Sequence, residues 1–442
     1  MNEESTIIPQ MDIFPKDHKN THPDGTPKGR PVCKASNTMN QRVSDLCSDV
    51  LGAVYNSEEG HEVQSAEHLL SRIEELNAKI RKKEINSERM MVGSLDVEAL
   101  YPSIDVRQAG EICRDRILNS ELKQEGIDYR WALIYLALTA TPVERVDLGL
   151  QGVIPKKISK FGRKPTVRTA DADEKRERWS YPVDPEKLSL IQKKKIQAGV
   201  VQQMIKLVFS THFYEWEGVF YQQVTGGPIG LRATGYVARV VMDFWAQKIG
   251  EMEDMCQTLW TLNPVMFENV QIHLLCKYVD DCFMAVDTFR LGIRWNSQQK
   301  AMVWSLESEE EDRSSGEDPE VITMREIAKM ATEVMKCLKF TFDTPKLNKS
   351  LTMPVLDSQI WVGNEQRETG IPVGLLRDTD LIQVKTGELQ KVVLFMFYQK
   401  PMVNRTSNLA RSAAPEGQKV STCTQEVLRR LKTTSRDLLP NS

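Results

Sequence analysis

Three aspartates lie within or directly after short apolar runs, where a carboxylate has few polar neighbours in the sequence to stabilise its charge. Asp280 and Asp281 interrupt the apolar run 273–286, and Asp96 follows the apolar segment Met91–Leu95. Adjacent carboxylates beside apolar surface repel each other and lose hydration unless a cation neutralises them. Carboxylate oxygens are the ligands that Mg²⁺ prefers. We therefore expect Asp280 and Asp281 to bind a divalent metal ion, with an ordinary solvent-facing Asp-Asp hairpin tip as the alternative. Taken alone, Asp96 is also explained as a cap of the turn after its strand, with Tyr101 in the core.

A glycine-rich segment lies between these acidic segments. Gln223 is followed by Gly226, Gly227 and Gly230, and then by the stretch from Tyr236 to Ile249, whose apolar residues share one helical face. Because glycine has no Cβ, such a turn lets the backbone approach a nucleotide closely. A glycine turn that only starts a helix is equally compatible with the spacing.

Short elements must position these residues. Met91–Leu95 predicts a buried strand that delivers Asp96 at its end, and the apolar residues around Asp280 predict a hairpin with the acids at its turn. Further helices are predicted within Ser65–Met90 and at Ile322–Leu338, and further strands around Phe340, at Val355–Val362 and at Val392–Tyr398. The stretch Glu307–Glu320 is acidic and of low complexity, which predicts an exposed loop.

In this order, the three segments resemble motifs A, B and C of the reverse-transcriptase palm. The surrounding sequence is similar to one branch, the reverse transcriptases of Penelope-like retroelements. The matching residues are His18-Lys19, Arg30-Pro31, SLDVEALYPSID at 94–105, Gln223 with Gly226 and Gly230, YVDD at 278–281, PVLD at 354–357 and FYQKP at 397–401. Ile229 and the residues 231–234 depart from the family pattern after motif B, and nothing resembles the C-terminal endonuclease of many Penelope-like proteins.

The resemblance implies an α+β fold of the right-hand polymerase type, with fingers, a palm that contains an antiparallel sheet, and a helical thumb. The chain is then expected to divide into fingers and a connecting helix at 1–90, a palm at 91–300 with a basic insertion at about 141–195, an acidic loop at 301–320, the end of the palm and the primer grip at 321–400, and a basic thumb-like region at 401–442.

The resemblance also implies an activity, RNA-directed DNA synthesis, in which the catalytic residues Asp96, Asp280 and Asp281 hold two Mg²⁺ ions, or Mn²⁺ in their place, that act on a primer 3′-hydroxyl. The expected partners are an RNA template, a DNA primer and dNTPs. Nucleotide or template contacts are expected from Tyr101, Ala99, Gln223, Gly226, Gly230, Arg30 and Lys34, and a primer grip from Phe397, Tyr398 and Lys400. Tyr101 would exclude a 2′-hydroxyl. An RNA-dependent RNA polymerase and an inactive or truncated retroelement-derived nucleic-acid-binding protein are the alternatives.

The composition is that of a globular protein with several subdomains. The chain has 442 residues, of which 40% are hydrophobic and 27% charged, and its net charge of -3 shows no basic excess. The eight cysteines are scattered without zinc-ligand spacing, which indicates reduced intracellular thiols. No signal peptide or membrane span is expected. We expect an intracellular protein that acts in the nucleus or the cytoplasm, and we favour the nucleus because priming on chromosomal DNA takes place there.

Overall fold

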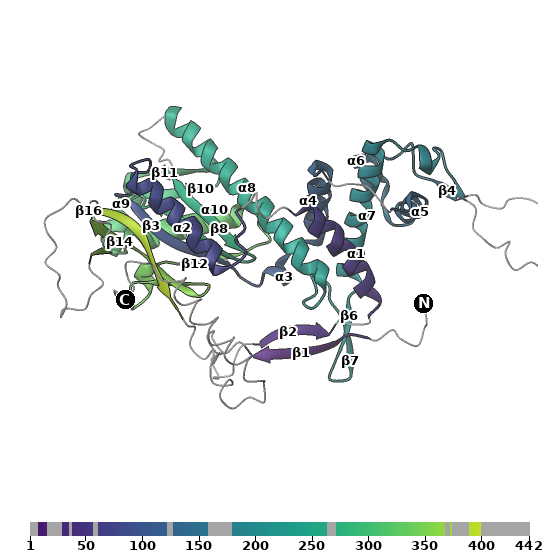
Figure 1. Ribbon diagram of the computed structural model, residues 1–442, viewed down its shortest axis with the longest axis horizontal. Coiled ribbons are helices and arrows are strands. Elements are labelled where there is room, and N and C mark those ends of the chain that lie inside the picture. Colours follow the sequence, from purple (N-terminus) through teal and green to yellow (C-terminus); the bar gives the residue numbers. More distant parts are fainter. Residues whose placement is uncertain are drawn as a thin grey trace, which may run out of the picture. The chain divides into compact units, whose positions relative to one another are not determined.

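The computed structural model describes most of the chain as two compact units. The described residues are 8–15, 29–34, 38–55, 61–121, 127–157, 179–262, 271–366, 372–373 and 389–398. The first unit comprises Met1–Ile13, Pro31–Asn56 and Tyr101–Val241, and the second comprises Phe14–Arg30, Ser57–Leu100 and Met242–Ser442. Both units combine helices with sheets (Figure 1), so the expected α+β class is confirmed.

The first unit contains a four-stranded sheet in the order β2-β1-β6-β7. Its strands are β1 (Gln10–Pro15), β2 (Gly29–Lys34), β6 (Phe213–Trp216) and β7 (Val219–Gln222). β6 and β7 form a hairpin whose two turn residues, Glu217 and Gly218, have φ values of 51° and 78°. This is the type I′ turn, whose twist matches that of the paired strands.

Helices packed around α7 make up most of the rest of the first unit. α7 (Leu190–Ser210) begins at a capping box formed by Ser189 and Gln192, and it packs against α1, α4 and α5. The other elements are α1 (Met39–Val54), α3 (Leu100–Ser103), α4 (Val106–Asn119), α5 (Tyr129–Thr139), α6 (Pro142–Asp147), β4 (Lys156–Lys157), β5 (Trp179–Ser180) and the 3-10 helix η2 (Pro185–Lys187). The expected basic insertion falls on α6 to α7, although 158–178 lie outside the described residues.

The second unit is built on an antiparallel sheet in the order β12-β3-β9-β8. Its strands are β3 (Met90–Val97), β8 (Ile272–Tyr278), β9 (Asp281–Asp287) and β12 (Phe340–Asp343). β3 is a central strand paired on both sides, and its first four residues are all buried, which explains the continuous apolar sequence. The predicted strand before Asp96 and the predicted hairpin at Asp280 are confirmed.

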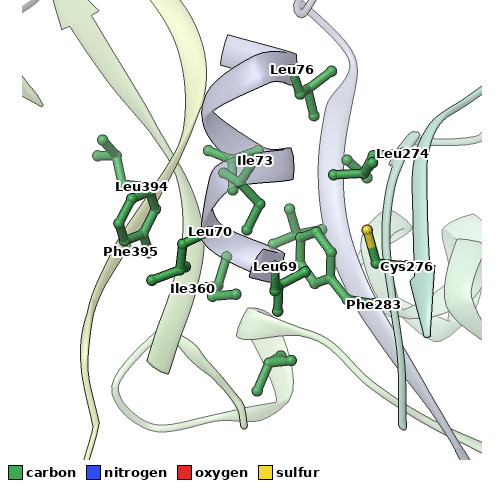
Figure 2. Close-up of a cluster of buried hydrophobic side chains, with 14 of the residues drawn as sticks. Leu69, Leu70, Ile73, Leu76, Leu274, Cys276, Phe283, Ile360, Leu394 and Phe395 are labelled. Carbon is green, nitrogen blue, oxygen red and sulfur yellow. The ribbon is translucent and has the colours of Figure 1, made fainter. Parts of the chain in front are cut away.

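A second sheet completes this unit, and α2 (Ala66–Arg81) packs between the two sheets. Its strands are β13 (Met353–Val355), β14 (Ser358–Gln366), β15 (Pro372–Val373) and β16 (Leu389–Phe397). Figure 2 shows α2 side chains that face Leu274 and Phe283 on one side and Ile360 and Phe395 on the other. The predicted helix within Ser65–Met90 therefore exists but ends at Arg81, where the chain turns at Lys83, whose φ is 61°.

Asn77 is the polar residue that joins α2 to β16. Its side chain is buried, donates to the Val393 carbonyl at 2.8 Å and accepts from the Val393 amide at 2.9 Å. We expect Asn77→Ala to lower the free energy of unfolding by about 2 to 4 kcal/mol, because both backbone groups lose their buried partner. Chemical denaturation measures this loss, and Lys79→Ala on the exposed face of α2 is the control. Equal stability of the two variants would contradict the assignment.

The other face of the β12-β3-β9-β8 sheet is covered by α10 (Pro319–Val334) and by α8 (Arg232–Leu262), which begins in the first unit. A Cβ on Gly93 would collide with the Met324 side chain, so glycine permits the close approach of α10. The Trp245 indole of α8 donates to the Ala331 carbonyl at 3.1 Å and stacks on Phe340. Two further elements, β10 (Ile293–Asn296) and β11 (Ala301–Trp304), form a separate hairpin, and η3 (Pro345–Leu347) follows β12.

The acidic segment expected as a loop at 301–320 is instead strand and helix, so this prediction was wrong. It forms β11, α9 (Leu306–Ser315) and the start of α10. Ser305 caps α9, Gly316 ends it with a φ of 64°, and the Asp312 carboxylate accepts hydrogen bonds from Arg294 and from the Gly292 amide. These local capping signals and charge partners stabilise a helix that composition alone does not predict.

The expected thumb at 401–442 lies outside the described residues. No helix among the described ranges is long and apolar enough to cross a membrane.

Candidate active site

Asp96 and Asp281 are direct cross-strand partners on β3 and β9. Partners in an antiparallel pair project from the same face of the sheet, with Cβ atoms about 4.5 to 5.5 Å apart. The register continues on both sides, since Asp281 pairs with Tyr278 on β8 and Asp96 pairs with Thr341 on β12. Thr341, Asp96, Asp281 and Tyr278 therefore form one row across the sheet, which we call the polar row.

The turn that joins β8 to β9 holds Asp280 next to this row. Because Tyr278 pairs with Asp281, the turn consists of Val279 and Asp280 alone. Val279 has a φ of 59°, which is a rare conformation for a β-branched residue and costs on the order of 1 to 3 kcal/mol. Such strain persists only where the surrounding structure holds it, and it is concentrated at functional sites.

The polar row lies at the boundary between the apolar core and the solvent-exposed surface. Asp96, Asp280 and Asp281 are half-buried, Tyr278 is 38% exposed, and the next residues inward on the same face, such as Phe283, belong to the core around α2. Two carboxylates directly opposite each other on a sheet are mutually destabilising. A divalent cation between them would offset this repulsion, and their oxygens are the donors that magnesium prefers.

The donor types and the register therefore fit a divalent metal ion. The carboxylates of Asp96, Asp280 and Asp281 do not lie close enough together to form a three-ligand metal site. Within the described parts of the chain, no group of three His, Cys, Asp or Glu side chains does so. The positions of the carboxylate oxygens depend on the side-chain rotamers, whereas the register fixes which residues are neighbours, so the backbone register is the decisive feature.

The turn after β3 contains Ala99 in the left-handed region, with a φ of 54°. This turn is fixed by the Glu98 amide, which donates to the Lys339 carbonyl at 2.9 Å, and by the Lys339–Glu98 ion pair at 2.7 Å. Ala99 is exposed. In the first unit, Tyr101 is half-buried and its carbonyl accepts from the Gly227 amide at 2.8 Å. The backbone of the expected sugar-excluding residue is thus bonded to the glycine-rich loop.

The glycine-rich loop packs against backbone of the same unit. A Cβ on Gly226 would collide with Pro102, and a Cβ on Gly230, whose φ is 121°, would collide with the Cys33 carbonyl. The Gln223 amide side chain donates to the Thr225 carbonyl within the loop. The space in front of both glycines, which we expected a nucleotide to use, is therefore occupied by protein backbone. The glycines are required for loop packing whether or not a nucleotide binds nearby.

Gly230→Ala should strongly destabilise the protein, because a Cβ there meets a backbone carbonyl and an unfavourable φ that alone costs about 1 to 3 kcal/mol. Gly235→Ala is the matched control, since α8 leaves open space at that position, and we expect it to stabilise the protein by about 0.5 to 1 kcal/mol. Thermal unfolding of the two variants measures both changes. A Gly230→Ala variant as stable as wild type would refute this description of the loop.

The remaining expected contact residues lie on β2 and around the end of β16. Lys34 on β2 is exposed and forms an ion pair with Asp12 at 2.8 Å, so its charge already has a partner, and Arg30 also lies on β2. Phe397 ends β16, and the half-buried Tyr398 donates its amide to the Asp357 carbonyl at 2.9 Å. Lys400 lies outside the described residues.

Sequence reasoning missed Lys277, which precedes Tyr278 on β8. Its side chain is completely buried and pairs with Glu62 at 2.5 Å and with Asp243 at 3.8 Å. The signal was a lysine inside an otherwise apolar strand, where a charge requires a buried partner.

Comparison with known proteins gives distant structural likenesses. No protein-family model and no curated protein sequence matches the chain. Among solved structures, apo telomerase from Candida tropicalis truncated from its C-terminal domain is 12% identical, with a TM-score of 0.36, over 80% of this chain and 53% of that one. Apo telomerase from Candida tropicalis is also 12% identical, with a TM-score of 0.36, over 81% of this chain and 48% of that one. Telomerase from Candida albicans in complex with the TWJ fragment of telomeric RNA is 9% identical, with a TM-score of 0.33, over 81% of this chain and 46% of that one. The chain spans about half the length of these structures.

Proposed function

We propose that this chain is an RNA-directed DNA polymerase, a reverse transcriptase of retroelement origin similar to the Penelope-like enzymes. The observation that carries the proposal is the cross-strand pairing of Asp96 with Asp281 beside the turn that contains Asp280. Two segments far apart in the sequence, one with Asp96 and the other with Asp280 and Asp281, lie side by side at one end of one sheet, in the order and surroundings that resemble motifs A and C.

In this proposal Asp96 and Asp280 bind two Mg²⁺ ions, Asp281 completes the set, and Mn²⁺ can substitute. Bound there, the ions supply activation of the primer 3′-hydroxyl and screening of the triphosphate charge. The chain itself contributes rigidity. Leu95 and Val97 are buried on the opposite side of β3 from Asp96, so the strand cannot rotate the carboxylate away from its partner.

The proposed partners are an RNA template, a DNA primer and dNTPs. Tyr101 limits the space beside the sugar, and its backbone bond to Gly227 fixes the point from which the ring projects. Gln223 stands at the start of the glycine-rich loop, and Tyr398 follows the strand proposed as the primer grip.

Primer extension on a defined RNA template with Mg²⁺ tests the proposal. We expect template-dependent extension of a DNA primer with dNTPs and little extension with NTPs. Extension with NTPs alone would indicate an RNA-dependent RNA polymerase instead. A folded protein that binds the template and primer but does not extend it would indicate an inactive nucleic-acid-binding protein.

A further inference from the structure

A buried group of three charged side chains lies behind the polar row. Lys277 is 0% exposed, and its partners Glu62 and Asp243 are 5% and 6% exposed. Its ammonium group is 2.5 Å from Glu62 Oε2 and 3.8 Å from Asp243 Oδ1. We call these three residues the buried ion cluster. Lys277 pairs with Cys282 across β8 and β9, so it projects from the opposite face to Tyr278 and Asp281.

Such a cluster is a poor means of stabilising a fold. Burying two or three charges costs several kcal/mol of desolvation per ion, and apolar residues of similar volume often serve stability equally well. Buried ion pairs are retained in some proteins because they specify one arrangement of the chain over others. The position of the cluster therefore indicates which part of the chain it holds in one arrangement.

Lys277 is the last residue of β8 before the exposed Tyr278, and both its backbone and its side chain make contacts with neighbouring segments. Its amide donates to the His61 carbonyl at 2.8 Å, and its carbonyl accepts from the Val63 amide at 2.8 Å, so the segment 61–63 covers the outer edge of β8. Its side chain reaches Glu62 in that segment and Asp243 on α8. The next residue, Tyr278, is exposed, and the strained turn at Val279 follows at once.

We propose that Lys277 is a positioning residue: with Glu62 and Asp243 it holds the base of the β8–β9 hairpin so that the strained Val279–Asp280 turn keeps Asp280 next to the polar row. Strained turns persist only where neighbouring contacts over-determine them, and this cluster is the charged contact at the hairpin base. The catalytic consequence rests on the proposed polymerase function, whereas the effect on the turn does not.

The test compares wild type with the neutral triple variant Lys277→Met, Glu62→Leu and Asp243→Asn. Amide hydrogen exchange is followed at Tyr278–Cys282 and at α10, together with thermal unfolding. We expect a folded variant in which exchange at the hairpin rises about 10-fold or more while α10 keeps its protection. The control is Arg294→Met with Asp312→Asn, which removes a partly buried ion pair elsewhere in the same unit and should leave exchange at the hairpin unchanged.

Primer extension by the same proteins supplies the catalytic readout. We expect the triple variant to lose about 100-fold in kcat, with a KM for dNTP near the wild-type value, because misplaced acids slow the reaction more than they weaken nucleotide binding. Adding Val279→Gly, which removes the strain, should restore part of the lost kcat and slow the exchange. Unchanged exchange at the hairpin, or a rise equal to that at α10, would overturn the proposal. An inactive wild type would refute the polymerase function, and the exchange data would still decide the role of Lys277.

Discussion

Asp281→Asn should strongly reduce primer extension while leaving the protein folded, and Asp96→Asn should do the same. Asparagine keeps the size of each side chain but removes the negative charge that binds a divalent ion. The two residues are cross-strand partners, so each variant should lose about 10²- to 10³-fold or more in kcat. Loss of one of two opposing carboxylates also relieves a repulsion, and we therefore expect equal or slightly higher thermal stability.

Steady-state primer extension and thermal unfolding measure these two effects. The matched control is Asp287→Asn, which makes the same substitution on β9 at the end of the strand away from the turn, where Asp287 contacts His273 at 2.8 Å. The control should retain activity close to wild type. If Asp281→Asn retained the activity of Asp287→Asn, the polar row would have no catalytic role.

Tyr101→Ala should increase the use of NTPs relative to dNTPs by about 10- to 100-fold. The proposed reason is steric, since the ring occupies the space that a 2′-hydroxyl would need. The backbone of Tyr101 is bonded through its carbonyl to the Gly227 amide, a contact that the substitution leaves intact. The change should therefore act on selectivity more than on folding.

Competition between each dNTP and its NTP in single-nucleotide extension measures this selectivity. Tyr101→Phe is the control, because it keeps the ring and removes only the hydroxyl, and it should discriminate as wild type does. An unchanged ratio in Tyr101→Ala would remove Tyr101 from the sugar-selecting role and leave the metal-binding acids unaffected.

The strands and helices around the acids could be predicted from the sequence because their apolar patterns are local. The run before Asp96 became β3, the apolar residues around Asp280 became β8 and β9, and the periodic stretch after Gly230 became part of α8. The register between β3 and β9, which pairs Asp96 with Asp281, could not be predicted. It depends on how two segments distant in the sequence align, and the pattern of either strand alone does not specify that alignment.

The expectations for the acidic segment and for the glycine-rich loop differ from the structure because both depend on contacts with residues elsewhere in the chain. The acidic segment forms α9 because Arg294 and the Gly292 amide bind Asp312, and composition does not reveal such partners. Gly226 and Gly230 are required by the approach of Pro102 and Cys33, which are remote in sequence. The buried position of Lys277 also depends on residues contributed by other elements, Glu62 and Asp243.

In the proposed mechanism, Asp96 acts together with the acids of the hairpin on shared divalent ions. Titration of the primer–template and dNTP complex with Mn²⁺, followed by electron paramagnetic resonance, tests it most directly. We predict that wild type binds Mn²⁺ tightly and that Asp96→Asn and Asp281→Asn each weaken this binding, whereas Asp287→Asn does not. If both Asp96→Asn and Asp281→Asn bound Mn²⁺ as tightly as wild type, these two aspartates would not be ligands of shared divalent ions.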